Sequence, residues 1–401
     1  MINQLVVNYL EGIRKQGLER HRNGSLLTAA VQSSSNGDLH ADISNALNFS
    51  SNDYLGLSEE LRLKKAFQNA FKRYPVGSGG SMVISGYHPC HRALEKAFAD
   101  AYGVDSALLF SSGYAANLGI VSLLTKLNLH MFLDKAAHAS FYDGLKIAAA
   151  HYSRFKHNDL DHLRMQLGNG QDQSFDQPLT NGKVVITEGI FSMSGQKAPL
   201  SAFDQVCLET EAIMIVDEAH SFGVLGPRGL GAVAEAQLSQ AAIPLRVIPF
   251  GKALGCQGAI VVGNHAWIDA LLQASRSYIY STAISPAFAA GLLEAFRLLQ
   301  EADEARQTLS MLIRYFKAQI RQSSLPWAAS DTPIQQLQLG CPYKALNFSS
   351  RLLERNIFCQ ALRQPTVSRK ETGLRIILTA QHTKANVDCL FDNLHLLAKG
   401  L

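Results

Sequence analysis

Short apolar runs alternate with longer, helix-length segments between residues 106 and 263, and this pattern restricts the possible folds more than any other feature of the chain. The runs are rich in valine and isoleucine, and they read SALLF, HMFLD, KVVITE, AIMIVDEAH, RVIPF and GAIVVG. Runs this short, separated by segments long enough to form helices, are typical of buried parallel strands joined by crossover helices. The sequence therefore predicts an α/β fold built on a mostly parallel sheet.

The rest of the chain predicts smaller units beside this sheet, because 401 residues exceed what one hydrophobic core usually supports. Apolar residues at helical spacing predict an amphipathic helix over residues 5–22, and the short strand ALNFS follows a polar turn. After Pro286, long helical stretches give way to short strands near IQQLQL and LRIILTA. We therefore divide the chain into an N-terminal segment over residues 1–50, a large domain over residues 51–285 and a C-terminal α+β domain over residues 286–401.

Charge and composition exclude several classes of function. The formal net charge of +4 is spread without a dense Lys/Arg block, which argues against binding to nucleic acid or to an anionic membrane. The N-terminus lacks a secretory cleavage site and no apolar run is long enough to span a bilayer, so we expect a cytoplasmic protein. The six cysteines are scattered without a CxxC pair, which argues against a zinc site or a disulfide framework and favours reduced, buried thiols.

Polar side chains follow the predicted strands, where ligands of open α/β sheets bind. In chain order these residues are Ser112, Gly113 and Tyr114, then Asp134 and His138, Glu188 and Ser192, Asp217 and His220, and finally Lys252. Each residue alone has an ordinary explanation: an aspartate can cap a helix, a histidine can be structural, and a lysine can be a surface charge. The combination is what calls for a chemical explanation.

Pyridoxal phosphate is a cofactor that needs this combination. It requires a lysine for a Schiff base, a carboxylate that keeps the pyridine nitrogen protonated, and an aromatic face over the ring. It also requires a helix N-terminus for its phosphate and a donor to its phenolate oxygen. These five roles can be filled, in order, by Lys252, Asp217, His138, the turn from Ser112 to Tyr114, and His220. Lys252 follows Asp217 by 35 residues, about one β-α-β unit, so we expect them on neighbouring strand ends.

An ordered series of motifs covers nearly the whole chain from about residue 45. It comprises NFSSNDYLGLS, VGSGGSMVISGYHPCHRALEKAFADAYG, LLFSSGYAANLG, DKAAHAS, HND, TEGIFSMSGQKAPL, VDEAHSFGVLGPRGLG and PFGKALGCQGA. The series resembles that of the α-oxoamine synthases, fold-type I pyridoxal-phosphate enzymes that condense an amino acid with an acyl thioester and release carbon dioxide. The resemblance implies a mostly parallel, mixed seven-stranded sheet and a homodimer whose sites lie at the subunit interface.

The C-terminal half narrows the expected substrates. The segments YIYSTAISPA, RQPTV and GLRIILTAQH are similar to those of family members that use L-alanine and a pimeloyl thioester, carried by coenzyme A or by acyl carrier protein. A sister enzyme that uses glycine, serine or another acyl thioester is the alternative within the family. A weakly active, cofactor-binding pseudoenzyme is the alternative from another class, and a purely structural protein would leave the polar strand ends unexplained.

The resemblance also implies roles for individual residues. Lys252, His138 and Asp217 would be catalytic: Lys252 forms the Schiff base, His138 stacks on the cofactor ring and contacts the thioester, and Asp217 pairs with the pyridinium. The cofactor would further contact Gly113, Tyr114, Ser192 and His220, and Ser281 and Thr282 would reach its phosphate from the neighbouring subunit. The substrates would contact Arg20 or Arg22, Asn52, His138 and Thr366, and the amino-acid carboxylate would bind Arg375 or, as the alternative, Arg363.

Pro249 departs from the family pattern. The family usually has a threonine or serine three positions before the lysine, where its hydroxyl donates to the phosphate, and proline has no such donor. Loss of this contact weakens cofactor binding by about 1–3 kcal/mol, the range for a hydrogen bond to a charged group. This residue motivates the pseudoenzyme alternative.

Overall fold

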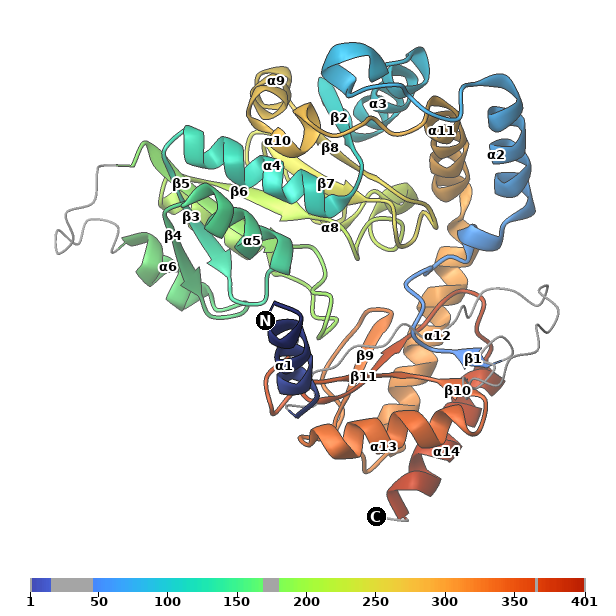
Figure 1. Cartoon of the computed structure of the whole chain (residues 1–401). Coiled ribbons are helices and arrows are strands. Elements are labelled where there is room, and N and C mark those ends of the chain that lie inside the picture. The colour runs from blue at the N-terminus through green and yellow to red at the C-terminus, as the bar shows by residue number, and fades with distance from the viewer. Residues whose placement is uncertain (1, 16–45, 169–179, 365–366, 400–401) are drawn as a thin grey trace.

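A computed structural model describes residues 2–15, 46–168, 180–364 and 367–399 of the chain (Figure 1). A seven-stranded sheet with its helices forms the upper part of Figure 1, and two small sheets with their helices form the lower part. The long helix α12 (Asp303–Gln322) extends from the upper part into the lower part. Among the described helices, none is long and apolar enough to cross a membrane.

The large sheet confirms the predicted fold class. Its strand order is β2-β8-β7-β6-β5-β3-β4, and only β8 runs antiparallel to its neighbours. The strands are β2 (Ser106–Phe110), β3 (Leu129–Asp134), β4 (Tyr152–Phe155), β5 (Gly182–Glu188), β6 (Ala212–Asp217), β7 (Leu245–Pro249) and β8 (Ala259–Gly263). All six apolar runs form strands. Strand β4 was not predicted, because this edge strand buries only Phe155 and therefore lacks an apolar run.

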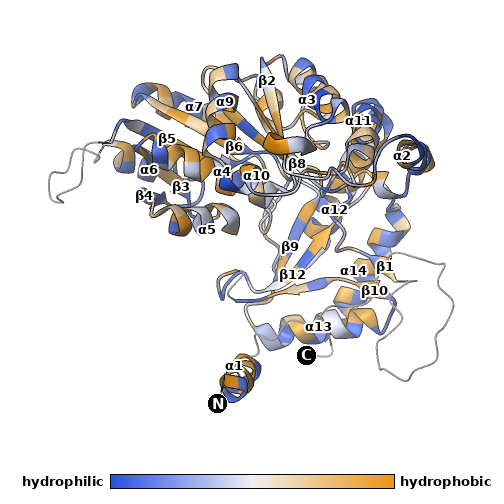
Figure 2. Cartoon of the chain, turned by 45° about the horizontal axis from the view of Figure 1, so that its top comes forward, coloured by the Kyte–Doolittle hydropathy of each residue, from blue (hydrophilic) through white to orange (hydrophobic). Residues whose placement is uncertain are grey.

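Helices cover both faces of this sheet, which explains why its strands are apolar throughout. Successive residues of a strand point to opposite faces. In β6, Met214 and Val216 pack with α6 (Leu160–Gly168), α7 (Leu200–Glu209) and α8 (Ala232–Glu235), whereas Ile215 packs into the opposite core. That opposite core includes α3 (Pro89–Tyr102), α4 (Gly113–Lys126), α5 (Ala139–Ala148) and α9 (His265–Ala274). Figure 2 shows the apolar colouring of strands such as β2 and β8.

The lower part contains two small sheets. Strand β1 (Leu47–Asn48) pairs in parallel with β10 (Ile357–Phe358). The other sheet has the antiparallel order β11-β12-β9, formed by Gln360–Leu362, Gly373–Ile377 and Ile334–Gln338. Helix α13 (Pro342–Leu353) packs against strands of both sheets, and α14 (Lys384–Lys399) packs against α12 and α13. The strands predicted at ALNFS, IQQLQL and LRIILTA are therefore present.

The remaining helices refine the predicted organisation. The predicted N-terminal helix appears as α1 (Ile2–Lys15), and the rest of its predicted range lies outside the described residues. Helix α11 (Pro286–Glu301) follows the predicted domain boundary but packs against α2 (Leu61–Arg73) and α3, which precede it. The short helix α10 (Arg276–Ile279) lies between α9 and α11 in the sequence. The division of the chain into three domains stays a prediction.

The cysteines are all free thiols, but they are not all buried. Cys90, Cys207 and Cys359 are buried, whereas Cys389 is exposed and the other two are partly exposed. The expectation of uniform burial was therefore wrong, because amphipathic helices such as α14 place small side chains on their solvent-facing side as well.

Candidate active site

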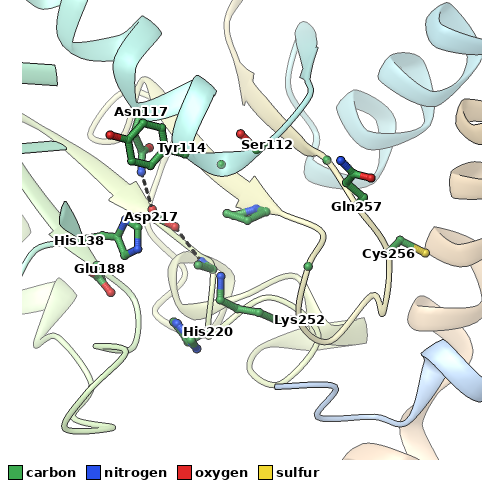
Figure 3. A pocket seen from close by; sticks show the side chains of 15 residues that line it. Ser112, Tyr114, Asn117, His138, Glu188, Asp217, His220, Lys252, Cys256 and Gln257 are labelled. Carbon is green, nitrogen blue, oxygen red and sulfur yellow. Dashed lines mark hydrogen bonds between the residues drawn. The ribbon is translucent and has the colours of Figure 1, made fainter. Parts of the chain in front are cut away.

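A cavity of about 300 Å³ opens at the carboxyl ends of the large sheet (Figure 3). This volume lies at the lower end of the range of roughly 300–1,000 Å³ that is common for small-molecule sites. Its lining brings together eight residues that were singled out at strand ends: Ser112, Gly113, Tyr114, His138, Glu188, Asp217, His220 and Lys252. The rule that ligands bind at strand ends therefore located this cavity from sequence.

Lys252 and Asp217 lie on neighbouring strand ends, as their spacing predicted. Strands β6 and β7 pair in parallel with Asp217 opposite Val247, and Lys252 follows the end of β7. Burial lowers the pKa of Lys252, while the nearby carboxylates of Asp217 and Glu188 oppose that shift. A lowered pKa makes the neutral amine, the form that attacks a carbonyl or accepts a proton, easier to reach.

Two hydrogen bonds fix the Asp217 carboxylate (Figure 3). Asn117 Nδ2 donates to Asp217 Oδ2 at 2.9 Å, and the backbone N–H of Ala219 donates to Asp217 Oδ1 at 2.9 Å. Asp217 is only 3% exposed, so water contributes little to holding it. The carboxylate therefore presents a fixed negative charge to the cavity.

His138 lines the cavity and precedes α5 as its N-cap. Its Nδ1 accepts a hydrogen bond from the backbone N–H of Ser140 at 3.3 Å and lies 2.8 Å from Ser140 Oγ. Ser140 Oγ in turn accepts from Asn117 Nδ2 at 2.9 Å, which leaves the serine hydroxyl proton for His138. Nδ1 is thus an acceptor, and in the neutral imidazole the proton lies on Nε2.

Asn117 and Ser140 were not among the predicted site residues. Asn117 uses both amide hydrogens, one for Asp217 and one for Ser140, and so links the carboxylate to His138. A signal was present in the sequence, because Asn117 lies one helical turn after Gly113 and shares its helix face. A polar residue at that spacing from the start of a helix at a strand end was a candidate for the cavity.

The start of α4 forms another wall of the cavity. Ser112 caps this helix, and its hydroxyl oxygen accepts from the backbone N–H of Ala115 at 3.1 Å. A Cβ atom at Gly113 would lie 2.7 Å from Pro249 Cγ, so the site requires glycine. Free N–H groups at a helix start attract anions such as phosphate, and Pro249 supplies an apolar surface beside them.

Glu188 is a buried carboxyl group in the same cavity. It is 2% exposed, and its Oε1 has no hydrogen-bond partner among the described residues. Burial and the charge of Asp217 raise the pKa of Glu188 well above its usual value. It was noted at a strand end in the sequence but received no role there.

His220 is held by a residue that sequence analysis did not select. Its Nδ1 lies 2.6 Å from the hydroxyl oxygen of Tyr54, and both side chains are buried. Burial lowers the pKa of His220 well below its usual value, and the positive charges of Lys252 and Arg375 act in the same direction. The imidazole is therefore neutral at physiological pH.

A second group of polar residues surrounds Arg375 on β12. Arg375 Nη2 donates to Asn52 Oδ1 at 3.0 Å, and Arg375 Nε donates to the backbone oxygen of Ser192 at 2.8 Å. The structure thus brings together three residues that were predicted from distant parts of the sequence. Ser192 contributes its carbonyl here, and it is not among the cavity-lining residues of the described chain.

The segment that carries Ser192 is tied to the C-terminal sheet. Thr332 Oγ1 donates to the backbone oxygen of Gly195 at 2.8 Å. Gly195 has a φ of 71°, and a Cβ atom there would lie 2.1 Å from the carbonyl oxygen of Ile334. We call this contact between Gly195 and residues 330–334 the Gly195 clasp.

The other predicted residues lie elsewhere. Ser281 and Thr282 line a separate small cavity of the described chain, and their predicted contact with a neighbouring subunit's phosphate stays a prediction. Arg363 follows β11 and does not line the cavity described above. Arg20, its alternative Arg22, and Thr366 lie outside the described residues.

The residues of the cavity fit pyridoxal phosphate. A buried amine and a fixed carboxylate lie on adjacent strand ends, and a glycine-bearing helix start can receive a phosphate. Two histidines, His138 and His220, line the same cavity. Glu188 Oε1, which has no partner within the described part of the chain, adds a buried polar group that a bound molecule can satisfy.

Comparison with known proteins agrees with this geometry. The profile of the aminotransferase class I and II family matches residues 44–394. An 8-amino-7-oxononanoate synthase from Marinobacter nauticus is 38% identical over 363 residues, which cover 90% of this chain and 89% of that protein. The crystal structure of 8-amino-7-oxononanoate synthase from Francisella tularensis has a TM-score of 0.75 at 31% identity, covering 89% of this chain and 98% of that one.

A second kind of relative shares the fold. Serine palmitoyltransferase from S. paucimobilis, solved with bound PLP and myriocin, has a TM-score of 0.82 at 29% identity, covering 88% of both chains. Sequence identity is higher to the synthase from M. nauticus, over a similar share of the chain. The chain therefore belongs to the 8-amino-7-oxononanoate synthase family, within the aminotransferase class I and II family.

Proposed function

We propose that the protein is an 8-amino-7-oxononanoate synthase of biotin biosynthesis, which depends on pyridoxal phosphate. It joins L-alanine to the acyl group of a pimeloyl thioester and releases carbon dioxide and the free thiol. The observation that carries this proposal is the convergence of Lys252, Asp217 and two histidines in one cavity. The names of the relatives and their coverage of the chain support the same reaction.

The residues of the cavity have distinct roles in this proposal. Pyridoxal phosphate, when bound, supplies an electron sink for the negative charge that develops on the amino-acid Cα. Asp217 would face the pyridine nitrogen and keep it protonated, because its carboxylate is fixed and buried. The helix start at Ser112 and Gly113 would hold the phosphate, with Tyr114 nearby.

Proton transfer falls to Lys252 and hydrogen bonding to His138. The lowered pKa of Lys252 suits an amine that first binds the cofactor and then removes the Cα proton of alanine. Neutral His138 carries its proton on Nε2 and can donate a hydrogen bond from it to the thioester carbonyl as negative charge develops. His138 would also stack on the cofactor ring.

The amino-acid carboxylate would bind Arg375, whose planar guanidinium can grip a carboxylate with two hydrogen bonds. Asn52 and Ser192 hold this arginine in place. Arg363 stays the alternative, and contacts of the substrate with Arg20 and Thr366 and of the cofactor with Ser192 remain predictions.

A homodimer in the cytoplasm completes the proposal. Ser281 and Thr282 lie outside the cavity of their own chain, so a phosphate contact from these residues requires a second subunit. All six cysteines are free, which agrees with a reducing compartment.

Product analysis by mass spectrometry tests this function. The holoenzyme is incubated with L-alanine and either pimeloyl-CoA or pimeloyl-acyl carrier protein, which also identifies the carrier. We expect 8-amino-7-oxononanoate and one equivalent of free thiol. Parallel reactions with glycine, or with serine and palmitoyl-CoA, test the sister reactions that the likeness to serine palmitoyltransferase raises. A preference for either pair would reject the proposal.

Lys252→Ala is the control for the chemistry. Loss of the amine removes the group that binds the cofactor covalently and the base that moves the proton, so turnover should fall by at least about 10³-fold. The visible absorption of the purified enzyme should change at the same time. Turnover and absorption equal to those of the wild type would contradict the assignment of Lys252.

A further inference from the structure

His157 lies between the edge of the large sheet and the segment that carries Ser192. It begins the HND motif, which follows β4 and has no role in the proposed reaction. Its Nδ1 lies 2.9 Å from Asp134 Oδ1 at the end of β3, and its Nε2 lies 2.7 Å from Gln196 Oε1. His157 does not line the cavity, so it can act only through the residues that it holds.

Both ring nitrogens of His157 face oxygen atoms that accept hydrogen bonds. An amide oxygen such as Gln196 Oε1 has no proton to give, so Nε2 donates. The Asp134 carboxylate also accepts from the backbone N–H groups of Ala136 and Asn158, at 2.8 and 2.9 Å, as an ionised carboxylate does. Nδ1 therefore donates as well, and an imidazole that donates from both nitrogens is the positively charged form.

The charges around His157 favour this form. Burial of the ring opposes a positive charge, but the hydrogen bonds to the carboxylate and the amide outweigh burial and raise the pKa of His157 above its usual value. The negative charge of Glu371, before β12, acts in the same direction. Lys197, in the segment that faces His157, is ion-paired with Glu235 at 3.1 Å.

Gln196 belongs to a closed turn over residues 190–197. The backbone N–H of Phe191 donates to the backbone oxygen of Gln196 at 2.9 Å and closes the turn. Within it, the backbone oxygen of Ser192 accepts from Arg375 Nε at 2.8 Å. The turn therefore connects the edge of the large sheet to the arginine at the amino-acid end of the site.

A change of pH can release one part of this connection. As the pH rises through the pKa of His157, the neutral ring keeps one proton. The charged acceptor, Asp134, is the stronger partner, so the bond to Gln196 is the one that is lost. The contact between the rings of His157 and Phe191, whose centroids lie 4.3 Å apart, does not depend on the charge, so we expect a modest effect.

We propose that His157 is a positioning residue: its charged imidazole holds the 190–197 turn, and the turn orients Arg375 for the carboxylate of the amino-acid substrate. The inference rests on the proposed function, because it takes Arg375 as the residue that binds this carboxylate. Gln196 is the link on one side of the turn, and the carbonyl of Ser192 is the link on the other.

Gln196→Met tests the inference, because Gln196 is exposed and methionine keeps its length without the accepting oxygen. Holoenzyme is titrated with L-alanine without thioester, and the apparent dissociation constant is read from the visible absorption of the cofactor. At about pH 6 the constant should rise about 3-fold over that of the wild type, as for loss of one hydrogen bond. At about pH 9 the two proteins should agree within about 1.5-fold, because the wild type has lost the same bond by deprotonation.

The comparison at each pH cancels the titration of alanine and of the cofactor, which both proteins share. Equal constants at about pH 6, or a 3-fold difference that persists at about pH 9, would overturn the proposal. Gln205→Met is the matched control, since this exposed glutamine bonds only to Glu209 on its own helix and its removal should change neither constant.

Gln196→Glu should rescue binding, because its carboxylate also accepts from His157 Nε2. At about pH 6 the constant should stay within about 1.5-fold of that of the wild type. At about pH 9 binding should be tighter than in the wild type, since a second carboxylate keeps the imidazole charged to a higher pH. A loss equal to that of Gln196→Met would overturn the proposal.

His157→Phe keeps a ring against Phe191 and removes both donors. In this background Gln196→Met should change the constant by less than about 1.5-fold, and a full 3-fold effect would overturn the proposal. The proposed function can fail separately: if glycine or serine replaces L-alanine as substrate, that reaction is rejected, and the same ratios measured with the accepted amino acid still decide the role of His157. A holoenzyme that binds none of the three would reject both.

Discussion

The two ends of the site are built in different ways. Asp217, Lys252 and His138, at the cofactor end, all follow strands of one sheet, so the parallel strands deliver them to the same edge. At the amino-acid end, Asn52, Ser192 and Arg375 come from three distant segments, and hydrogen bonds join their polar groups. A site can thus combine one part fixed by the geometry of a sheet with another part fixed by tertiary contacts.

Asp217→Asn should have the largest effect and should separate the two ends most clearly. The neutral amide cannot keep the pyridine nitrogen protonated, so we expect kcat to fall by about 10²–10³-fold, as for loss of one partner of a buried ion pair. KM for L-alanine should change little, because Arg375 is intact. Steady-state kinetics check this, with the surface variant Asp105→Asn as control. A rise in KM for L-alanine without a fall in kcat would contradict the assignment of Asp217 to the cofactor end.

Arg375→Lys should have the reverse pattern. Lysine keeps the charge but loses the planar pair of donors, so KM for L-alanine should rise by about 10- to 100-fold. The affinity for pyridoxal phosphate should stay within about 2-fold. Arg363→Lys is the matched variant, and a larger rise in KM there would transfer the carboxylate contact to Arg363.

Pro249→Thr should strengthen binding of the cofactor and should not affect the amino-acid end. A hydroxyl at this position can donate to a phosphate bound near Gly113, which should tighten binding of pyridoxal phosphate by about 10-fold. Pro249→Val has the shape of threonine without the hydroxyl and serves as control. Equal affinities of the two variants, measured by titration of apoenzyme, would show that no phosphate oxygen lies within reach of this side chain.

Thr332→Val should have the smallest effect and tests the Gly195 clasp. The change removes the hydrogen bond that the Thr332 hydroxyl donates to Gly195 and the one that it accepts from the backbone N–H of Ile334. It should lower the free energy of unfolding by about 1–2 kcal/mol and raise KM for L-alanine by about 2- to 3-fold, because the clasp holds the segment of Ser192. Urea unfolding and kinetics measure both effects. Thr210→Val removes a hydroxyl that bonds only to its own helix, so it should leave KM unchanged.

The contrast between the two ends also explains what the sequence could predict. The six apolar runs identified the sheet, and polar residues at their ends identified the cavity, because both follow from local periodicity. The spacing of Asp217 and Lys252 even predicted their neighbouring strands. Edge strand β4 was not predicted, because its exposed residues do not form an apolar run.

The amino-acid end depended on the family resemblance, since nothing local marks it. Asn52 and Arg375 are 323 residues apart, and no periodicity relates them. Tyr54 lies in the run DYLGL and looks like an ordinary core residue, because its hydrogen bond to His220 crosses 166 residues. Ser140 was missed for the same reason, because its role arises from a contact between α4 and α5, whereas the spacing of Asn117 after Gly113 was a local signal.

The two-faced packing of β6 carries a consequence for insertions and deletions. Met214, Ile215 and Val216 alternate between two apolar cores, so conservative exchanges among them keep the same pattern of burial. One residue inserted before Asp217 would reverse every side chain that follows it within the strand. Asp217 would then lose its place beside Asn117, although the sheet would still bury apolar residues on both faces. The position of Asp217 therefore depends more on the length of this strand than on which apolar residues fill it.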